Sequence, residues 1–164
     1  SSPHLVLWLS EKNSKDKKIF WKKLYEHVLK KYSLPKIASI DKYTKLCEDL
    51  IKLKNIKRYK NYASLLYVVT LKNLDFSVNK LRGKWGYFYE YDCKNLNHLA
   101  KFIDNTCQTL TYIEVKKDIL KKFIVKNNLR GIDRIVPSGQ GLSMSLYWDG
   151  YDINQTLSRV IDLK

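Results

Sequence analysis

The feature that most constrains the fold is the order of short strand-like runs and longer helix-like segments along the chain. Apolar and aromatic runs typical of β-strands occupy residues 5–9, 63–71, 86–92, 109–115 and 133–136. Helical spacing of apolar residues occurs at 14–32, 39–54 and 116–128, and again after Asp152. Because strands and helices alternate in the second half, we predict one α/β domain, residues 1–164, with a largely parallel sheet flanked by helices.

The two helices predicted in the first half carry apolar stripes. In the segment 14–32, Phe20, Leu24 and Val28 recur at the i, i+4, i+8 spacing of one helix face. A stripe in the segment 39–54 is also typical of a helix that faces a core. This second stripe consists of Tyr43, Leu46, Cys47, Leu50 and Ile51. We therefore predict that Cys47 is a small core residue rather than a nucleophile.

The elements predicted near the C-terminus have recognisable ends. Gly131 is well placed to stop the helix 116–128. The side chains of that helix expected to face inward are Ile119, Leu120, Phe123 and Ile124. Asp152 and Gln155 resemble a capping box that opens a last helix. Its expected core stripe consists of Ile153, Leu157, Val160 and Ile161.

The chain is strongly basic. Its formal net charge is +15, from 31 Lys and Arg against 16 Asp and Glu. Such an excess suits nucleic acid or a polyphosphate ligand, but it also arises from Lys spread over solvated helix faces. The densest cluster is expected at a helix end, where cations suit the helix dipole, and consists of Lys52, Lys54, Lys57, Arg58 and Lys60. Because charge is scattered elsewhere and no nucleic-acid motif occurs, we favour a solvated surface.

Cysteine, histidine and hydropathy patterns restrict the environment. No apolar run approaches the length of a transmembrane helix, about 18 residues. The three cysteines are far apart and lack CxxC spacing, which argues against a zinc site or a disulfide framework and favours a cytoplasmic protein. They are Cys47, Cys93 and Cys107. The three histidines show no metal-ligand spacing and are expected at surface or packing positions; they are His4, His27 and His98.

Two stretches have the features of ligand-binding loops. In the first, Trp148, Asp149 and Gly150 precede the last predicted helix, where Trp148 offers an apolar wall and a helix N-terminus favours an anion. In the second, Trp85 and Gly86 lead into the strand 86–92, where a glycine lets a ligand approach the backbone closely. A structural loop and a plain turn are the alternative interpretations.

Together these stretches resemble a known family. The segments "RGIDRIVPSGQ" and "WDGYDINQTLSRVI", with "LRGKWGYFYEYD", "QTLTY" and the opening "SSPH", are similar to the C-terminal part of the LuxC-type acyl-CoA reductases. These enzymes belong to the aldehyde dehydrogenase superfamily, and the likeness spans essentially the whole chain. The resemblance implies the catalytic-domain half of that fold. It also implies an NADPH-dependent reduction of an acyl thioester to an aldehyde, through an acyl group held on a Cys.

The resemblance assigns residues to a site. It implies that the nucleophilic Cys stands immediately before Ser1, so that this chain holds no catalytic residue and is an inactive part of a larger reductase. The residues expected beside the nucleophile are Ser1, Ser2 and Pro3. Those expected at the cofactor are Trp85 and Gly86, although Gly83 stands where the family has a Glu. Those expected at the acyl pocket are Trp148, Asp149 and Gly150.

The resemblance also implies partners. They are an acyl-CoA or other acyl thioester, an acyl-transferring protein and further copies of the chain, but no metal. A function of a different class stays open, namely a stand-alone basic α/β module that binds nucleic acid. Its rings at residues 85–91 would stack on the bases of a single strand. We rank nucleic acid below the acyl thioester as a partner.

Overall fold

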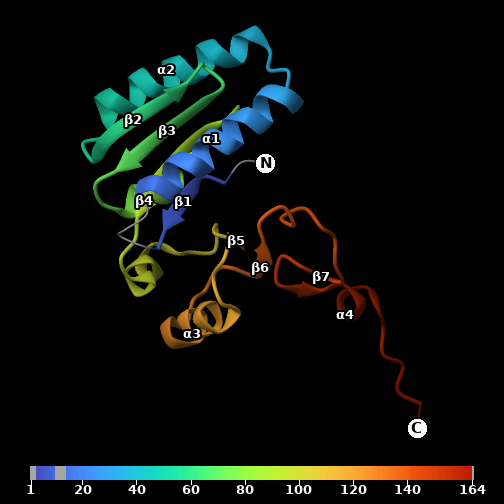
Figure 1. Cartoon of the computed structure of the whole chain (residues 1–164). Helices are drawn as coiled ribbons and strands as arrows, with labels where there is room; N and C mark the ends of the chain where they lie inside the picture. The colour runs from blue at the N-terminus through green and yellow to red at the C-terminus, as the bar shows by residue number, and fades with distance from the viewer. Residues whose placement is uncertain (1–2, 10–13, 164) are drawn as a thin grey trace. The chain divides into compact units, whose positions relative to one another are not determined.

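The structure is a computed structural model that describes residues 3–9 and 14–163 (Figure 1). The chain forms two compact units, Ser1–His98 and Leu99–Lys164, where the sequence predicted one domain. No helix in the described ranges combines the length and apolar character needed to cross a membrane.

The first unit contains a four-stranded sheet. Its strands are β1 (Leu5–Trp8), β2 (Ile56–Tyr62), β3 (Leu66–Leu71) and β4 (Tyr87–Asp92). Their order is β1-β4-β3-β2, in which β4 is parallel to both β1 and β3, and β2 pairs antiparallel with β3 at the edge. The predicted mixture of helices with a largely parallel sheet is therefore confirmed for this unit.

The helices α1 (Ser14–Lys31) and α2 (Lys36–Lys52) cover opposite faces of this sheet (Figure 1). On one face, Trp21 of α1 packs in a core with Leu66, Val68 and Phe88. The predicted stripe of α1 is confirmed, since its apolar side chains pack against that core; they are Phe20, Leu24 and Val28. Neighbouring strand residues point to the other face, where α2 lies.

The predicted stripe of α2 is wrong at three of its five positions, since Leu46 is buried and Cys47 is half-buried as a small core residue would be. Tyr43, Leu50 and Ile51 are exposed, Ile51 to 83%. The buried residues of the helix are Ala38, Lys42, Leu46 and Asp49. Hydropathy alone misplaced the face because Lys42 has hydrogen-bond partners in the turns before β3 and β4, and Asp49 has partners on β4. These hydrogen bonds offset the free-energy cost of burying the two charged groups.

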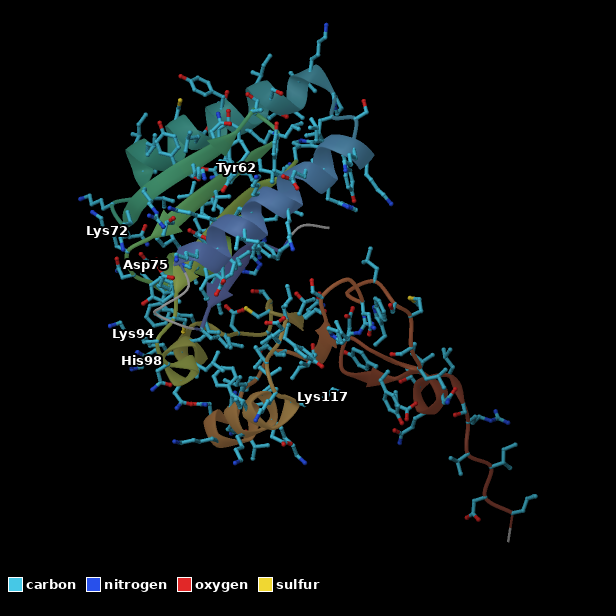
Figure 2. All side chains as sticks on the ribbon, viewed as in Figure 1. Tyr62, Lys72, Asp75, Lys94, His98 and Lys117 are labelled. Atoms are coloured by element: carbon cyan, nitrogen blue, oxygen red, sulfur yellow. The ribbon has the colours of Figure 1, made fainter. Side chains whose placement is uncertain are left out.

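The basic cluster predicted at a helix end is instead mostly strand. Residues Lys57, Arg58 and Lys60 lie on β2, where all three are exposed. The strand is joined to β3 by a tight turn at Ala63 and Ser64, whose φ angles of 44° and 58° fit a type I′ turn. Tyr62, labelled in Figure 2, ends β2 with its ring 5.9 Å from that of Tyr25 on α1.

Short 3₁₀ helices lie on either side of β4, at Phe76–Lys80 and Leu96–Phe102. The second unit then contains β5 (Thr109–Tyr112), α3 (Lys117–Asn127) and β6 (Arg134–Pro137), and β5 is parallel to β6. Of the side chains expected to face inward on α3, Leu120 and Phe123 are buried, whereas Ile119 is 48% exposed.

Of the two helix ends predicted in the second unit, the end of α3 was wrong and the start of the last helix was confirmed. The helix α3 ends at Asn127 and is capped by Asn128, which adopts the left-handed conformation with φ 45°, so Gly131 is not its stop. The capping of the last helix is confirmed, because the carboxylate of Asp152 accepts a hydrogen bond from the Gln155 N–H at 3.2 Å.

The last predicted helix is much shorter than expected. The strands β7 (Tyr147–Trp148) and β8 (Tyr151–Asp152) pair antiparallel, and α4 covers only Ile153–Leu157. The expected core stripe is wrong, because α4 has no buried residue and Val160 is 95% exposed. A helix of five residues cannot present that stripe to a core, since Val160 and Ile161 lie beyond its end.

Candidate functional site

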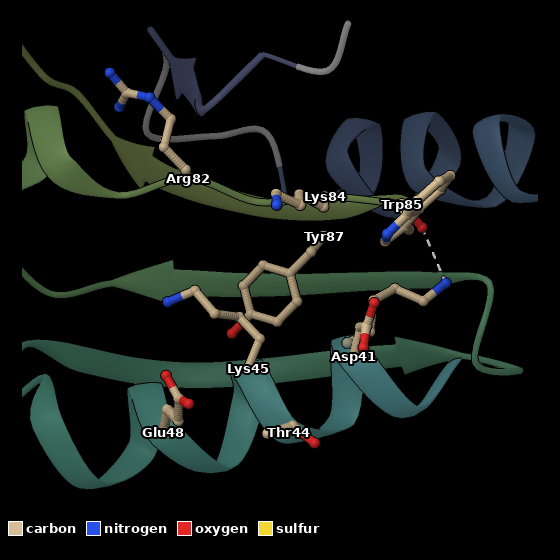
Figure 3. A pocket seen from close by; sticks show the side chains of 9 residues that line it. Asp41, Thr44, Lys45, Glu48, Arg82, Lys84, Trp85 and Tyr87 are labelled. Carbon is tan, nitrogen blue, oxygen red and sulfur yellow. Dashed lines mark hydrogen bonds between the residues drawn. The ribbon is translucent and has the colours of Figure 1, made fainter. Parts of the chain in front are cut away.

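A hollow of about 370 Å³ lies between α2 and the segment that leads into β4 (Figure 3). We call it the Trp85 pocket. Its lining residues are Asp41, Lys42, Thr44, Lys45, Glu48, Arg82, Lys84, Trp85 and Tyr87. A volume of this size falls within the range of pockets that hold small ligands, roughly 300–1,000 Å³.

The buried ammonium group of Lys42 connects α2 to the starts of two strands. Lys42 is 1% exposed, and its Nζ donates hydrogen bonds of 2.9 Å to the carbonyl oxygens of Leu65 and Trp85. Leu65 directly precedes β3 and Trp85 lies two residues before β4. Burial lowers the pKa of Lys42. The side chain thus fixes the position of Trp85 relative to the neighbouring strand.

The turn at Trp85 has an unusual backbone. Trp85 and Gly86 have φ angles of 56° and 89°, and the N–H of Tyr87 donates to the carbonyl oxygen of Lys84 at 3.0 Å, as in a type I′ turn. Gly86 is required, since a Cβ there would lie 2.6 Å from the carbonyl oxygen of Leu65. A left-handed conformation is strained for a large aromatic residue. Trp85 keeps this conformation, lines the pocket and is 44% exposed.

A buried carboxylate lies behind the pocket. Asp49 is 3% exposed and accepts hydrogen bonds from the hydroxyl groups of Tyr87 at 2.7 Å and Tyr89 at 2.5 Å. Lys45 pairs with the other oxygen of the same carboxylate at 2.5 Å. Burial, followed by the hydrogen bonds to Asp49, raises the pKa of both tyrosines well above the usual value. Both hydroxyl groups therefore stay protonated and act as donors.

The pocket has an excess of positive charge. Four of its lining residues are cationic and two are acidic. Glu48 pairs with Lys52 on the outside of α2, and Lys45 pairs with Asp49. No ion pair among the described residues includes Lys42 or Lys84. Figure 3 shows the guanidinium group of Arg82 pointing away from the other lining side chains.

The sheet register relates the pocket to the N-terminal segment. Leu5 of β1 is paired in parallel with Tyr89 of β4, so Pro3 and Trp85 both lie just before the amino-terminal ends of these neighbouring strands. His4, which follows Pro3, lies near the pocket residue Arg82. Burial, and then the charge of Arg82, lower the pKa of His4. The sequence gave no indication that His4 lies near Arg82, beyond its position before a strand. The predicted residues Ser1 and Ser2 lie outside the described residues.

The predicted acyl-pocket residues form a hairpin turn in the second unit. Asp149 and Gly150, with φ angles of 48° and 83°, connect β7 to β8 as the Asp-Gly pair of a type I′ turn. The guanidinium group of Arg134 lies 4.6 Å from the centre of the Trp148 ring. Arg134 also donates to the carbonyl oxygens of Gln140 and Gly141. These contacts favour the structural interpretation of this loop.

Sequence reasoning missed a second buried carboxylate, on the α1 face of the sheet. Glu90 is 3% exposed and accepts hydrogen bonds from the indole N–H groups of Trp8 and Trp21 at 2.8 and 2.9 Å. Its other oxygen accepts from the hydroxyl group of Thr70 at 2.7 Å. A Glu inside an aromatic strand was the available signal, because a buried acid needs donors.

The remaining candidates for chemistry are few. Cys93 is buried, and burial raises the pKa of its thiol, which makes it a poor nucleophile. Within the described residues, no group of three or more His, Cys, Asp or Glu could hold a metal ion. The sequence matches no family model, and no curated protein is significantly similar to it.

Proposed function

We propose that this chain is the C-terminal catalytic-domain portion of an NADPH-dependent acyl-CoA reductase. The observation that supports this most is the parallel register of β1 and β4, which sets Pro3 and Trp85 at the amino-terminal ends of neighbouring strands although they are 82 positions apart. A reductase of this kind needs its nucleophile and its cofactor side by side. The proposal puts the nucleophilic Cys immediately before Ser1 and the cofactor against Trp85.

The Trp85 pocket has the chemistry that such a cofactor requires. NADPH is anionic and carries flat rings, and the pocket combines a surplus of cations with the exposed ring of Trp85. Gly83 replaces the Glu of the family pattern. A Cβ at Gly83 would collide with the carbonyl oxygen of Tyr87, so no larger residue fits there. In this protein the cofactor would be held by the Trp85 turn without that carboxylate.

In the proposed reaction, the Cys thiolate attacks the thioester carbonyl carbon, and the sulfur of coenzyme A leaves as a thiolate. The acyl group is then a thioester of the Cys. NADPH, when bound, supplies the hydride that reduces this acyl group, and the aldehyde leaves as the Cys thiolate is restored. The contribution of this chain is positional. Lys42 holds the Trp85 turn, and β1 fixes the residues that follow the nucleophile.

The experiment uses the full natural protein with a fatty acyl-CoA and NADPH, and follows NADPH oxidation and aldehyde formation. We expect Trp85→Ala to raise the KM for NADPH roughly tenfold, as loss of an aromatic contact of 1–1.5 kcal/mol does. Tyr59→Ala, which removes an exposed ring on β2, is the matched control and should leave KM unchanged. A natural protein without a Cys before Ser1 overturns the proposal.

A second candidate function is nucleic-acid binding. The surface that favours it is the strand β2, whereas the sequence predicted rings at residues 85–91. Tyr87, Phe88 and Tyr89 are buried, so their rings are not available to stack on bases. Tyr59 on β2 is 51% exposed between Arg58 and Lys60, which is a usual arrangement for binding a single strand. Binding of a single-stranded oligonucleotide that weakens steeply with salt, and is lost in Tyr59→Ala, would support this function.

A further inference from the structure

A buried cation without a carboxylate partner lies at the Trp85 pocket. An ammonium group has three donors, and Lys42 uses two of them on the carbonyl oxygens of Leu65 and Trp85. No ion pair among the described residues includes Lys42. A buried charge is costly unless it is paired or fully hydrogen-bonded. The ammonium also lies 5.9 Å from the centre of the Tyr67 ring, which attracts the charge but accepts no conventional hydrogen bond. Because Lys42 lines the pocket, its third N–H is a donor suited to an anion that enters there.

The other residues of the pocket favour the same kind of ligand. Lys84 is exposed on the segment before β4 and also lacks an ion pair among the described residues. The acidic lining residues do not cancel this charge, because Glu48 is paired with Lys52 and only Asp41 remains opposite the two lysines. Trp85 adds a flat apolar wall. The pocket thus combines a buried donor, an exposed cation and an aromatic surface.

We propose that the Trp85 pocket is a phosphate-binding site, in which Lys42 donates from the buried side and Lys84 from the exposed side. Phosphate is favoured over a carboxylate because it carries more charge and presents three oxygens to separate donors. This inference goes beyond the reductase proposal and rests on the pocket alone. Two small molecules of the proposed reaction carry phosphate groups, NADPH and coenzyme A, and the test distinguishes them.

The test titrates the 164-residue chain with inorganic pyrophosphate and follows heat and tryptophan fluorescence. We expect saturable binding that weakens about tenfold in Lys84→Ala and in Lys42→Met, the usual effect of losing a hydrogen bond to a charged group. Lys57→Ala removes one exposed cation from β2, outside the pocket, and should not change the affinity. Lys84→Ala keeps the test decisive if Lys42→Met does not fold.

Competition then identifies the source of the phosphate. NADPH and coenzyme A are added separately to the pyrophosphate complex, and the compound that displaces pyrophosphate in a Lys84-dependent way is the ligand. Absence of saturable pyrophosphate binding overturns the inference, as does an equal loss of affinity in Lys57→Ala, which would indicate diffuse attraction to a basic chain. Neither result decides the reductase proposal, which is tested separately by the presence of a Cys before Ser1 and by NADPH oxidation.

Discussion

The indole N–H of Trp21 on α1 donates a 2.9 Å hydrogen bond to the carboxylate of Glu90, at the centre of the sheet. Trp8 on β1 donates to the same oxygen, and Thr70 on β3 donates to the other. Three elements of the first unit are thus tied to β4 through one buried acid. No cation pairs with Glu90 among the described residues, so neutral donors alone satisfy its charge.

Removing this acid should destabilise the fold strongly. In Glu90→Ala three donors lose their acceptor, those of Trp21 and Thr70 in buried hydrogen bonds, and we expect the free energy of unfolding to fall by about 2–4 kcal/mol. Glu90→Gln keeps one carbonyl oxygen for the indoles and should cost less. Guanidinium denaturation followed by tryptophan fluorescence measures both. Glu26→Ala, which removes an exposed acid from α1, is the control, and an equal loss there would contradict the prediction.

The tyrosines on Asp49 should make the fold sensitive to alkali. The pKa of Tyr87 and of Tyr89 is raised in the folded state, so the unfolded chain loses these protons first as the pH rises past about 10. Above that pH the free energy of unfolding should fall by about 1.4 kcal/mol per pH unit for each tyrosine.

The lowered pKa of Lys42 acts in the opposite direction, since its contribution to stability increases as the pH rises toward the unfolded value of about 10.4. The double variant Tyr87→Phe, Tyr89→Phe isolates the tyrosines. Thermal unfolding of this variant from about pH 8 to about pH 11 should show a shallower alkaline loss than the parent chain. Parallel profiles for the two proteins would refute the assignment.

His4 should control part of the acid response. Its folded pKa lies below 6.5, so the unfolded chain binds a proton first as the pH falls through that value. The free energy of unfolding should therefore decrease below about pH 6.5. Arg82→Ala should reduce this decrease because the guanidinium is one cause of the shift, whereas Arg82→Lys keeps the charge. Urea denaturation across this range measures the slopes; identical slopes in both variants would rule out the coupling.

Two substitutions at Trp85 separate backbone strain from the loss of the ring. Trp85→Gly and Trp85→Ala both remove the indole, but only glycine adopts φ 56° without strain. We expect Trp85→Gly to be more stable than Trp85→Ala by about 1 kcal/mol, as measured by chemical denaturation. Pyrophosphate affinity should be similar in the two variants. If Trp85→Ala is the more stable, the turn is not strained at this residue.

Local sequence patterns predicted the first unit well where burial is apolar. Phe20, Leu24 and Val28 faced the core as their spacing indicated, and the strands β3 and β4 followed from their β-branched and aromatic composition. The polar edge strand β2 was not predicted, because its residues are mostly basic and exposed. The face of α2 could not be predicted in the same way. Lys42 and Asp49 are buried with hydrogen-bond partners from segments later in the chain, and the spacing of residues within one helix contains no information about those partners.

The candidate site was predicted in part. Trp85 and Gly86 were singled out correctly as an unusual lead into a strand, and they do line or adjoin the pocket. The contact of Lys42 with Trp85 could not be predicted, because Lys42 belongs to the helix α2, far from Trp85 in the sequence. For Asp149 and Gly150 the difficulty is that one local pattern has two interpretations. An Asp-Gly pair fits both a binding loop and a hairpin turn, and only the pairing of β7 with β8 distinguishes the two.

The cations on β2 have a consequence for how the sheet ends. An outer strand exposes unpaired backbone groups that invite another copy to continue the ladder. A second β2 brought to the usual spacing of about 4.8 Å would set Lys57, Arg58 and Lys60 against like charges. Repulsion between these cations thus disfavours association of two copies through β2. This repulsion is electrostatic, so it should weaken near 1 M salt, where charges are screened beyond about 3 Å. Pairing of a second copy with the β2 edge, which extends the sheet across the strand direction, then becomes less unfavourable.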